Sequence, residues 1–353
     1  MGTASEQLVE RLFDACIGAL DLLHVYVGDT LGLYRALNEL GPVTTADLAA
    51  KTGLAERYVR EWCEHQAVAG IVAVDEAGER FSLPEGHADV LVDDRSLSFF
   101  APVGAGIVSL GATMPKVLDA FRTGGGVPYE AYGDDVRTFI ERINRPMYLN
   151  LLAATWFPQV PGLVERLNTD PPARVADVGC GRGWSAISIG VGFPKAVVTG
   201  LDLDADSVET ARRNAAAEGV ADRVSFECRN AADPGLAGSF DLVCAFETIH
   251  DMCDPVGALR AMRSLRAEGG TVLVADEKVA DEFTTDAEPA ERFQWGWSAL
   301  HCLPTAMVEA PAAGTGTIMR APTLRRYAQQ AGFADVEVLS IENDFWRFYR
   351  LVG

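Results

Sequence analysis

The sequence predicts an α/β protein in which a mostly parallel, Rossmann-like sheet follows a helical N-terminal region. In Arg174–Gly183 a short apolar strand leads into three glycines at alternate positions, and a helix is expected from Trp184. From there on, apolar runs of strand length alternate with helical patterns, which is typical of a parallel sheet covered on both faces. The segment before Arg174 is mainly helical and contains one small hairpin. We therefore expect a helical domain in front of a ligand-binding α/β domain.

Length and composition exclude several classes of protein. The chain has 353 residues, enough for about two domains, and 48% of them are apolar. The formal charge of −20 argues against a nucleic-acid partner and against an anionic membrane surface. No apolar run is long enough to span a bilayer, and no signal peptide is visible. The seven scattered cysteines lack a C-x-x-C pair and are typical of reduced thiols, so we expect a cytoplasmic protein.

Residues 1–92 have the pattern of a winged helix. A helical run over 6–40 ends at Gly41-Pro42, and two short helices and a hairpin follow, at Asp47–Lys51, Glu56–Ala69, Ile71–Val74 and Arg80–Leu83. Winged helices often bind DNA, but this segment has six Lys and Arg residues against 15 Asp and Glu residues. A surface that binds a polyanion is basic. We therefore expect a packing and dimerisation module.

Residues 93–168 are predicted to form a helical linker or lid. Asp134–Leu152 has the pattern of one long amphipathic helix, and Arg145-Pro146 predicts a kink in it. The glycine triplet at 124–126 indicates either a flexible crossing between two domains or a plain surface loop.

Residues 169–353 are predicted to be the ligand-binding domain, with an insertion at 278–320. A short turn joins the last two strands, so one strand of the sheet must run antiparallel. The expected strands are Val175–Val178, Val197–Leu201, Val224–Cys228, Phe240–Phe246, Thr271–Ala275, Val336–Ser340 and Phe345–Leu351. The expected helices are Trp184–Gly190, Ser207–Glu218, Pro255–Leu265 and Thr323–Ala331.

The glycine loop is the candidate cofactor site. Gly179, Gly181 and Gly183 allow positive φ and a close approach of a ligand to the backbone, and the helix that follows offers unpaired N–H groups. Asp202, followed by Leu203, lies 19 residues after Gly183, where a carboxylate accepts both ribose hydroxyls of an adenosyl ligand. This second spacing suits dinucleotides and other adenosyl ligands equally.

Two further segments reach the same edge of the predicted sheet. Phe246 ends the fourth strand and His250 follows it, and histidine is the side chain best suited to proton transfer near neutral pH. The adjacent acids Asp276 and Glu277 end the fifth strand, where they would orient either a substrate or His250. We predict His250 and Glu277 as catalytic residues, although a buried structural histidine and a solvated pair of acids are the alternatives.

Two of these motifs resemble known ones. Asp177 and the three glycines form Asp-x-Gly-x-Gly-x-Gly, which resembles motif I of the class I S-adenosylmethionine-dependent methyltransferases. Ile-His-Asp-Met at 249–252 resembles the Leu-His-Asp-Trp stretch of small-molecule O-methyltransferases, whose histidine is the general base. The resemblance, to an actinobacterial group with an N-terminal winged helix, covers nearly the whole chain.

This resemblance implies a seven-stranded class I sheet with an antiparallel last strand, S-adenosylmethionine as the cofactor and His250 as the base. It implies cofactor contacts from Asp177, Asp202 and Phe246, and dimerisation through the N-terminal domain. At Asn230, which Ala231 follows, the family commonly has an acid that receives the adenine amino group. An amide oxygen accepts the same bond, so we expect both residues in the cofactor site, with an ordinary turn as the alternative.

A second resemblance leads to a different chemistry. Some 2-oxo acid C-methyltransferases hold iron through a His-Asp pair after the fourth strand and a further histidine in the later insertion. This chain has His250, Asp251 and His301 at matching places, two imidazoles and a carboxylate. Our first hypothesis is O-methylation of a small molecule without a metal ligand set, and the second is metal-assisted C-methylation. A third is a non-catalytic cofactor-binding regulator. The tryptophans of the insertion, Trp295 and Trp297, suggest an acceptor pocket or a subunit contact.

Overall fold

The computed structural model describes residues 2–353, which divide into two compact units. The first consists of residues up to Gly111 together with Asp134–Pro146, and the second of Ala112–Gly133 and Met147–Gly353. The predicted boundaries at 92/93 and 168/169 stay a prediction.

The first unit contains the expected winged helix. Its helices pack around Leu33, Leu37, Leu48 and Trp62, and its small antiparallel sheet has the order β1-β3-β2. The predicted helical run over 6–40 consists of two helices, because the chain turns at Leu31 and at Gly32, whose φ is 71°. The elements are α1 (Ala4–Thr30), α2 (Leu33–Leu40), β1 (Val43–Thr44), α3 (Thr45–Thr52), α4 (Glu56–Val68), β2 (Ala73–Val74), β3 (Arg80–Ser82) and α5 (His87–Leu91).

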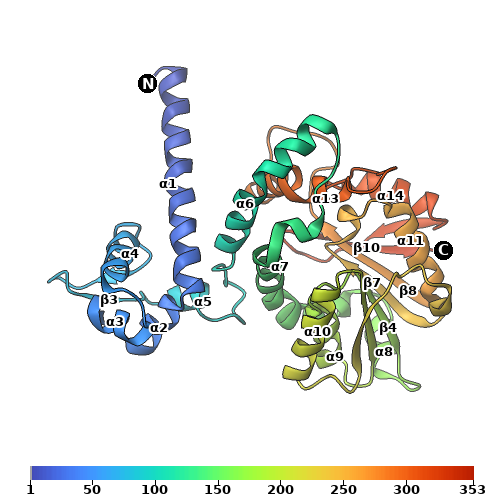
Figure 1. Cartoon of the computed structure of the whole chain (residues 1–353). Coiled ribbons are helices and arrows are strands. Elements are labelled where there is room, and N and C mark those ends of the chain that lie inside the picture. Colours follow the sequence, from blue (N-terminus) through green and yellow to red (C-terminus); the bar gives the residue numbers. More distant parts are fainter. Residues whose placement is uncertain (1) are drawn as a thin grey trace. The chain divides into compact units, whose positions relative to one another are not determined.

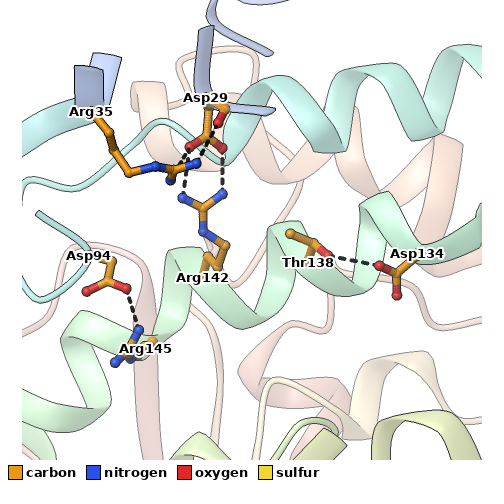
Figure 2. Close-up of polar contacts among 7 residues, drawn as sticks. All are labelled: Asp29, Arg35, Asp94, Asp134, Thr138, Arg142 and Arg145. Carbon is orange, nitrogen blue, oxygen red and sulfur yellow. Dashed lines mark hydrogen bonds and ion pairs between the residues drawn. The ribbon is translucent and has the colours of Figure 1, made fainter. Parts of the chain in front are cut away.

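Two long helices, α6 (Val103–Thr123) and α7 (Gly133–Met147), follow the winged helix in sequence. Within the first unit α7 is held by ion pairs, as Figure 2 shows: the buried carboxylate of Asp29 accepts hydrogen bonds from both terminal nitrogens of Arg142, at 2.5 and 2.9 Å. Arg145 donates to Asp94 at 2.6 Å. The helical run predicted over 134–152 continues through Pro146 into a π-helical segment, η2 (Tyr148–Trp156), and the kink at Arg145-Pro146 stays a prediction.

The dark blue helix α1 in Figure 1 carries a row of apolar side chains that are exposed in this chain. Leu8, Leu12, Leu20 and Leu23, whose helical spacing predicts this helix, belong to the exposed row. The row contains Leu8, Val9, Leu12, Phe13, Ile17, Leu20, Leu23 and Val27. Among residues 2–353 no single helix is long and apolar enough to cross a membrane; only α1 and α2 pass together, and they are bent by 67°.

The second unit is the predicted α/β domain, built on a seven-stranded sheet of order β6-β5-β4-β7-β8-β10-β9. Five strands are parallel, and β10 runs antiparallel to both β8 and β9, which confirms the predicted antiparallel strand. The strands are β4 (Arg174–Val178), β5 (Val197–Asp202), β6 (Val224–Cys228), β7 (Phe240–Phe246), β8 (Arg266–Glu277), β9 (Asp335–Val338) and β10 (Trp346–Val352).

Alternate residues of each central strand serve two cores, one on each face of this sheet. Val175 belongs to the core shared with η2, α8 (Leu163–Asn168), α9 (Trp184–Gly192) and α10 (Ala205–Ala217). Ala176 belongs to the core shared with α11 (Pro255–Leu265) and α14 (Ala321–Gln330). Figure 1 shows the labelled helices on the two sides of this sheet. The carboxyl ends of the five parallel strands therefore lie along the same edge of the sheet.

The insertion at 278–320 contains one helical run, made of α12 (Pro289–Trp297), the π-helical η6 (Ser298–Cys302) and α13 (Leu303–Ala306), between irregular segments. The glycine triplet at 124–126 lies against it. A Cβ at Gly126 would meet the backbone of Val308 at 2.4 Å, and Val127 donates its N–H to the Pro304 carbonyl at 2.9 Å. These residues are therefore packed in place, and the role of a lid stays a prediction.

Candidate functional site

The glycine loop has the backbone that its sequence predicts. Gly179, Gly181 and Gly183 have φ values of 70°, 51° and 88°, which side chains disfavour. A Cβ at Gly179 would lie 2.3 Å from Oγ1 of Thr248, so the segment after β7 lies directly against the loop. At Gly181 an added Cβ meets nothing within 4 Å, which leaves that backbone open to a ligand.

Asp177 supports the turn from β4 into α9. Its buried carboxyl accepts a hydrogen bond from Ser185 on α9, at 2.5 Å. Burial raises the pKa of Asp177 to about 7, although hydrogen bonds from Ser185 and Cys244 oppose this shift. This carboxyl is therefore hydrogen-bonded within the protein, and its contact with a cofactor stays a prediction.

Asp202 connects the end of β5 to the same loop. Its two carboxylate oxygens accept the N–H groups of Gly181, at 2.8 Å, and of Asp204, at 2.9 Å. Burial raises the pKa of Asp202, and the two N–H donors limit the rise. Leu203, which follows, is exposed. The carboxylate is thus fixed beside the glycine backbone, where we predict the ribose.

The segment after β6 forms a tight turn. Asn230 accepts the N–H of Ala232 on its side-chain oxygen, at 2.9 Å, so the oxygen predicted to receive an adenine amino group already has one donor. Ala231 packs against the core beneath α11 and α14. Phe246, at the end of β7, is buried with its ring centroid 5.7 Å from that of Tyr148. The cofactor roles of these residues stay predictions.

His250 lies in a short 3₁₀ helix, η5 (Ile249–Asp251), directly after β7, and it is 1% exposed. Its Nδ1 is 2.6 Å from a carboxylate oxygen of Asp276, and its Nε2 is 3.2 Å from one of Asp251. Burial disfavours the charged imidazole, but the two carboxylates together raise the pKa of His250 well above its ordinary range. We assign Nδ1 as the protonated donor to Asp276, which leaves Nε2 as the nitrogen that takes up a proton.

Asp276, absent from the predicted catalytic pair, is the acid that holds His250, and Glu277 is not. The Glu277 carboxyl lies beside that of Glu247, and its pKa is raised well above the ordinary value by burial and by that neighbour. Glu247 itself has φ 54°. Successive residues of a strand point to opposite faces. The sequence signal was the adjacent pair of acids, but only the register of β8 decides which of them faces His250.

The cluster around His250 and Asp251 contains Cys302, and not His301, the residue that the metal hypothesis needs. Ligand atoms of His250, Asp251 and Cys302 all lie within 4.8 Å of one another. His301 adjoins this group, with its Nδ1 3.3 Å from Sγ of Cys302, and its ring packs edge-on against Tyr132. Burial lowers the pKa of His301, and it raises the pKa of Cys302 to about 12. Because η6 is π-helical, sequence spacing alone did not indicate which of the two residues faces His250.

Comparisons with known proteins agree with this architecture. A model of the methyltransferase domain family matches residues 170–309, and a model of the Rv2258c-like winged HTH domain matches residues 18–93. Methyltransferase GfsG of Streptomyces halstedii is 30% identical over 171 residues, which are 45% of this chain and 60% of that protein. The matched region is thus less than two thirds of that relative's length.

Solved structures share the fold over the whole chain. Human N-acetylserotonin methyltransferase, in complex with S-adenosylmethionine, has a TM-score of 0.73 at 17% identity and covers 100% of both chains. An O-methyltransferase family protein from Burkholderia thailandensis has a TM-score of 0.71 at 17% identity, covering 100% of this chain and 98% of that one. Residues 170–309 therefore match a methyltransferase domain, and residues 18–93 in front of it match an Rv2258c-like winged helix-turn-helix domain.

Proposed function

We propose that this protein transfers a methyl group from S-adenosylmethionine to a hydroxyl of a small molecule, with His250 as the general base. The observation that carries the proposal is the buried His250–Asp276 pair, with a separation of 2.6 Å, on the segment that lies against the glycine loop. A base held by a carboxylate beside a nucleotide-type loop suits the removal of one proton from an acceptor.

The residues of the loop fit the cofactor. The open backbone at Gly181 and the fixed carboxylate of Asp202 would hold the methionine and ribose parts, and Asn230 and Phe246 would line the adenine. S-adenosylmethionine supplies an electrophilic methyl group on a sulfonium.

The chain's own groups align the acceptor and remove its proton. The reactive form is the one in which Nε2 of His250 carries no proton, and the raised pKa of His250 makes this the minor form near neutral pH. In that form Nε2 accepts the hydroxyl proton while the acceptor oxygen forms its bond to the methyl carbon. The electron pair of the broken carbon–sulfur bond stays on sulfur. Asp276 stabilises the imidazolium that results, and the proton then passes to solvent. We include Glu277 as a residue that positions the acceptor, because its Oε2 is buried without a hydrogen-bond partner among residues 2–353.

Calorimetry and an acceptor screen test this proposal. We expect S-adenosylhomocysteine to bind, and Asp202→Ala to weaken its binding. A screen of phenols should then identify acceptors by the release of S-adenosylhomocysteine. With such an acceptor, His250→Ala should lower kcat by about 10²–10⁴-fold and leave the Kd of S-adenosylhomocysteine unchanged. Full turnover in His250→Ala would contradict the role of the base, and absence of binding would contradict the cofactor class.

The second hypothesis, C-methylation of a 2-oxo acid, has less support. Its ligand set needs His301, whereas Cys302 lies in the cluster with His250 and Asp251. For this reason 2-oxo acids are the second class in the screen. The regulator hypothesis predicts DNA binding by a domain with a net charge of −9 over residues 1–92, and we expect no gel shift at low salt.

We also propose that the protein is a cytoplasmic homodimer. The exposed apolar row on α1 is larger than the single apolar residues usual on a monomer surface, and a second copy of α1 would cover it. All seven cysteines are free among the described residues, which suits a reducing compartment. Light scattering should give the mass of a dimer for the wild type and of a monomer for Leu12→Asp/Phe13→Asp. A monomeric wild type would contradict this proposal.

A further inference from the structure

A thiol, an imidazole and a carboxylate from two separate segments converge beside the base. His250 and Asp251 come from η5 after β7, and Cys302 ends η6 in the insertion, some 50 residues later. We propose that these three side chains form a binding site for a thiophilic divalent cation, zinc foremost, through Nε2 of His250, a carboxylate oxygen of Asp251 and Sγ of Cys302.

The separations suit a tetrahedral ion after small movements. Zinc bonds of about 2.0–2.3 Å place neighbouring ligand atoms of a tetrahedron roughly 3.3–3.8 Å apart. Nε2 of His250 and the Asp251 oxygen are already 3.2 Å apart, and all three ligand atoms lie within 4.8 Å of one another. Nitrogen, oxygen and sulfur are the ligands that zinc accepts, and three protein ligands leave a fourth position open for water.

Two of the ligands are held from outside the cluster, as ligands of metal sites are. Asp276 accepts from Nδ1 of His250 at 2.6 Å, which fixes the ring with Nε2 toward Asp251. Nδ1 of His301 lies 3.3 Å from Sγ of Cys302, where its N–H would stabilise a thiolate. His250, Cys302, His301 and Asp276 are all buried. A surface cluster of acids lacks such a second layer of buried partners.

The charge of the surroundings also favours a cation. The carboxylates of Asp251 and Asp276 both face His250. Binding releases the thiol proton of Cys302 to solvent, so the ion exchanges for at least one proton.

A consequence follows that rests on the proposed function. An ion bound to Nε2 of His250 occupies the lone pair that takes the acceptor proton, so zinc acts as a reversible inhibitor of methyl transfer. The site itself does not depend on the identity of the acceptor, because its ligands are all side chains of this chain.

Cobalt(II) is the probe, because a thiolate ligand gives it a sulfur-to-cobalt charge-transfer band and a tetrahedral site gives it intense visible bands. Full-length protein freed of metal by chelation should show both with one cobalt per chain, and one equivalent of zinc should abolish both. Cys302→Ser should lose the charge-transfer band. Asp276→Asn should keep the band and weaken metal affinity by about 10–100-fold. Cys253→Ser, which removes a thiol outside the cluster, is the matched control and should behave as the wild type.

The absence of a charge-transfer band in the wild type overturns the site, and so does a band that persists in Cys302→Ser, because the metal would then be bound by another thiol such as the exposed Cys16 or Cys228. Turnover during zinc titration separates this inference from the proposed function. Inhibition that is reversed by a chelator and lost in Cys302→Ser supports both. A cobalt signature that depends on Cys302, with turnover unaffected by zinc, supports the site and refutes His250 as the base.

Discussion

Removing the negative charge of Asp276 should slow methyl transfer without weakening cofactor binding. In Asp276→Asn the side-chain oxygen still accepts from Nδ1 of His250, so the change is mainly electrostatic. At 2.6 Å, a carboxylate and a full imidazolium interact by about 6 kcal/mol at an effective dielectric constant of about 20. With the proton half transferred, about 3 kcal/mol of this acts in the transition state, which corresponds to a kcat lower by about 10²-fold.

The assay is the release of S-adenosylhomocysteine at saturating concentrations of both substrates, at a pH where kcat has reached its plateau and His250 is neutral in both enzymes, because Asp276 also raises the pKa of His250. The Kd of S-adenosylhomocysteine is measured in parallel by calorimetry. Asp281→Asn is the matched control, because Asp281 is an exposed aspartate five residues further on that pairs with Arg347 at 3.0 Å. We expect that control to keep the wild-type kcat. A kcat of Asp276→Asn within about threefold of wild type would refute the electrostatic role. A parallel loss of S-adenosylhomocysteine binding would show instead that the substitution damages the cofactor site.

Three further predictions concern the cofactor loop and stability. Gly183→Ala places a Cβ 2.6 Å from the ring of Phe226 at a φ of 88°, so it should lower both the thermal midpoint of unfolding and the affinity for S-adenosylhomocysteine. Gly181→Ala has open space around its Cβ and should mainly lower that affinity. Equal midpoints of the two variants in differential scanning fluorimetry would contradict this contrast. Asp29→Asn should lower the free energy of unfolding by about 1.5–3 kcal/mol in urea denaturation, since it removes a buried carboxylate with two charged donors, and an unchanged midpoint would contradict that role. The pKa of Asp177 is raised to about 7, so the folded state binds this proton more tightly than the unfolded state. The free energy of unfolding should therefore fall as pH rises from about 4 to 7, by up to about 1.4 kcal/mol per pH unit. Asp177→Asn should remove this contribution to the pH dependence of the free energy of unfolding, and an identical pH dependence in the variant would contradict the assignment.

The fold was predictable where the signal is local. The glycine loop after β4 and the alternation of strands and helices depend on a few consecutive residues, and both were correct. The break at Gly32 was not predicted, because the helical spacing of apolar residues continues across it. The pattern on α1 predicted a helix but not the exposure of its leucines, since periodicity shows only that one face is apolar and not what covers it.

In the candidate site, the position of residues that come shortly after a strand was predictable, as for His250, which lies four residues after the end of β7. The sequence alone did not show whether Asp276 or Glu277 faces His250. The two side chains point to opposite faces of the sheet, and only the pairing of β8 with β7 and β10 fixes which face each of them takes. Cys302 was missed for a different reason. Its approach to Asp251 joins segments about 50 residues apart, and the π-helical turn of η6 sets its direction.

The residues of the candidate site come from two parts of the domain, the sheet and the insertion, and this has an evolutionary consequence. Gly181, Asp202, His250 and Asp276 all stand at the edge of the sheet, whereas His301 and Cys302 belong to the helical insertion. Mutations in the insertion alter what faces His250, while the residues that orient His250 and form the loop keep their supports. For the proposed methyl transfer, we therefore expect duplicated genes of this kind to diverge in acceptor through this one segment, and a chimera that carries a relative's insertion tests whether the acceptor changes with it.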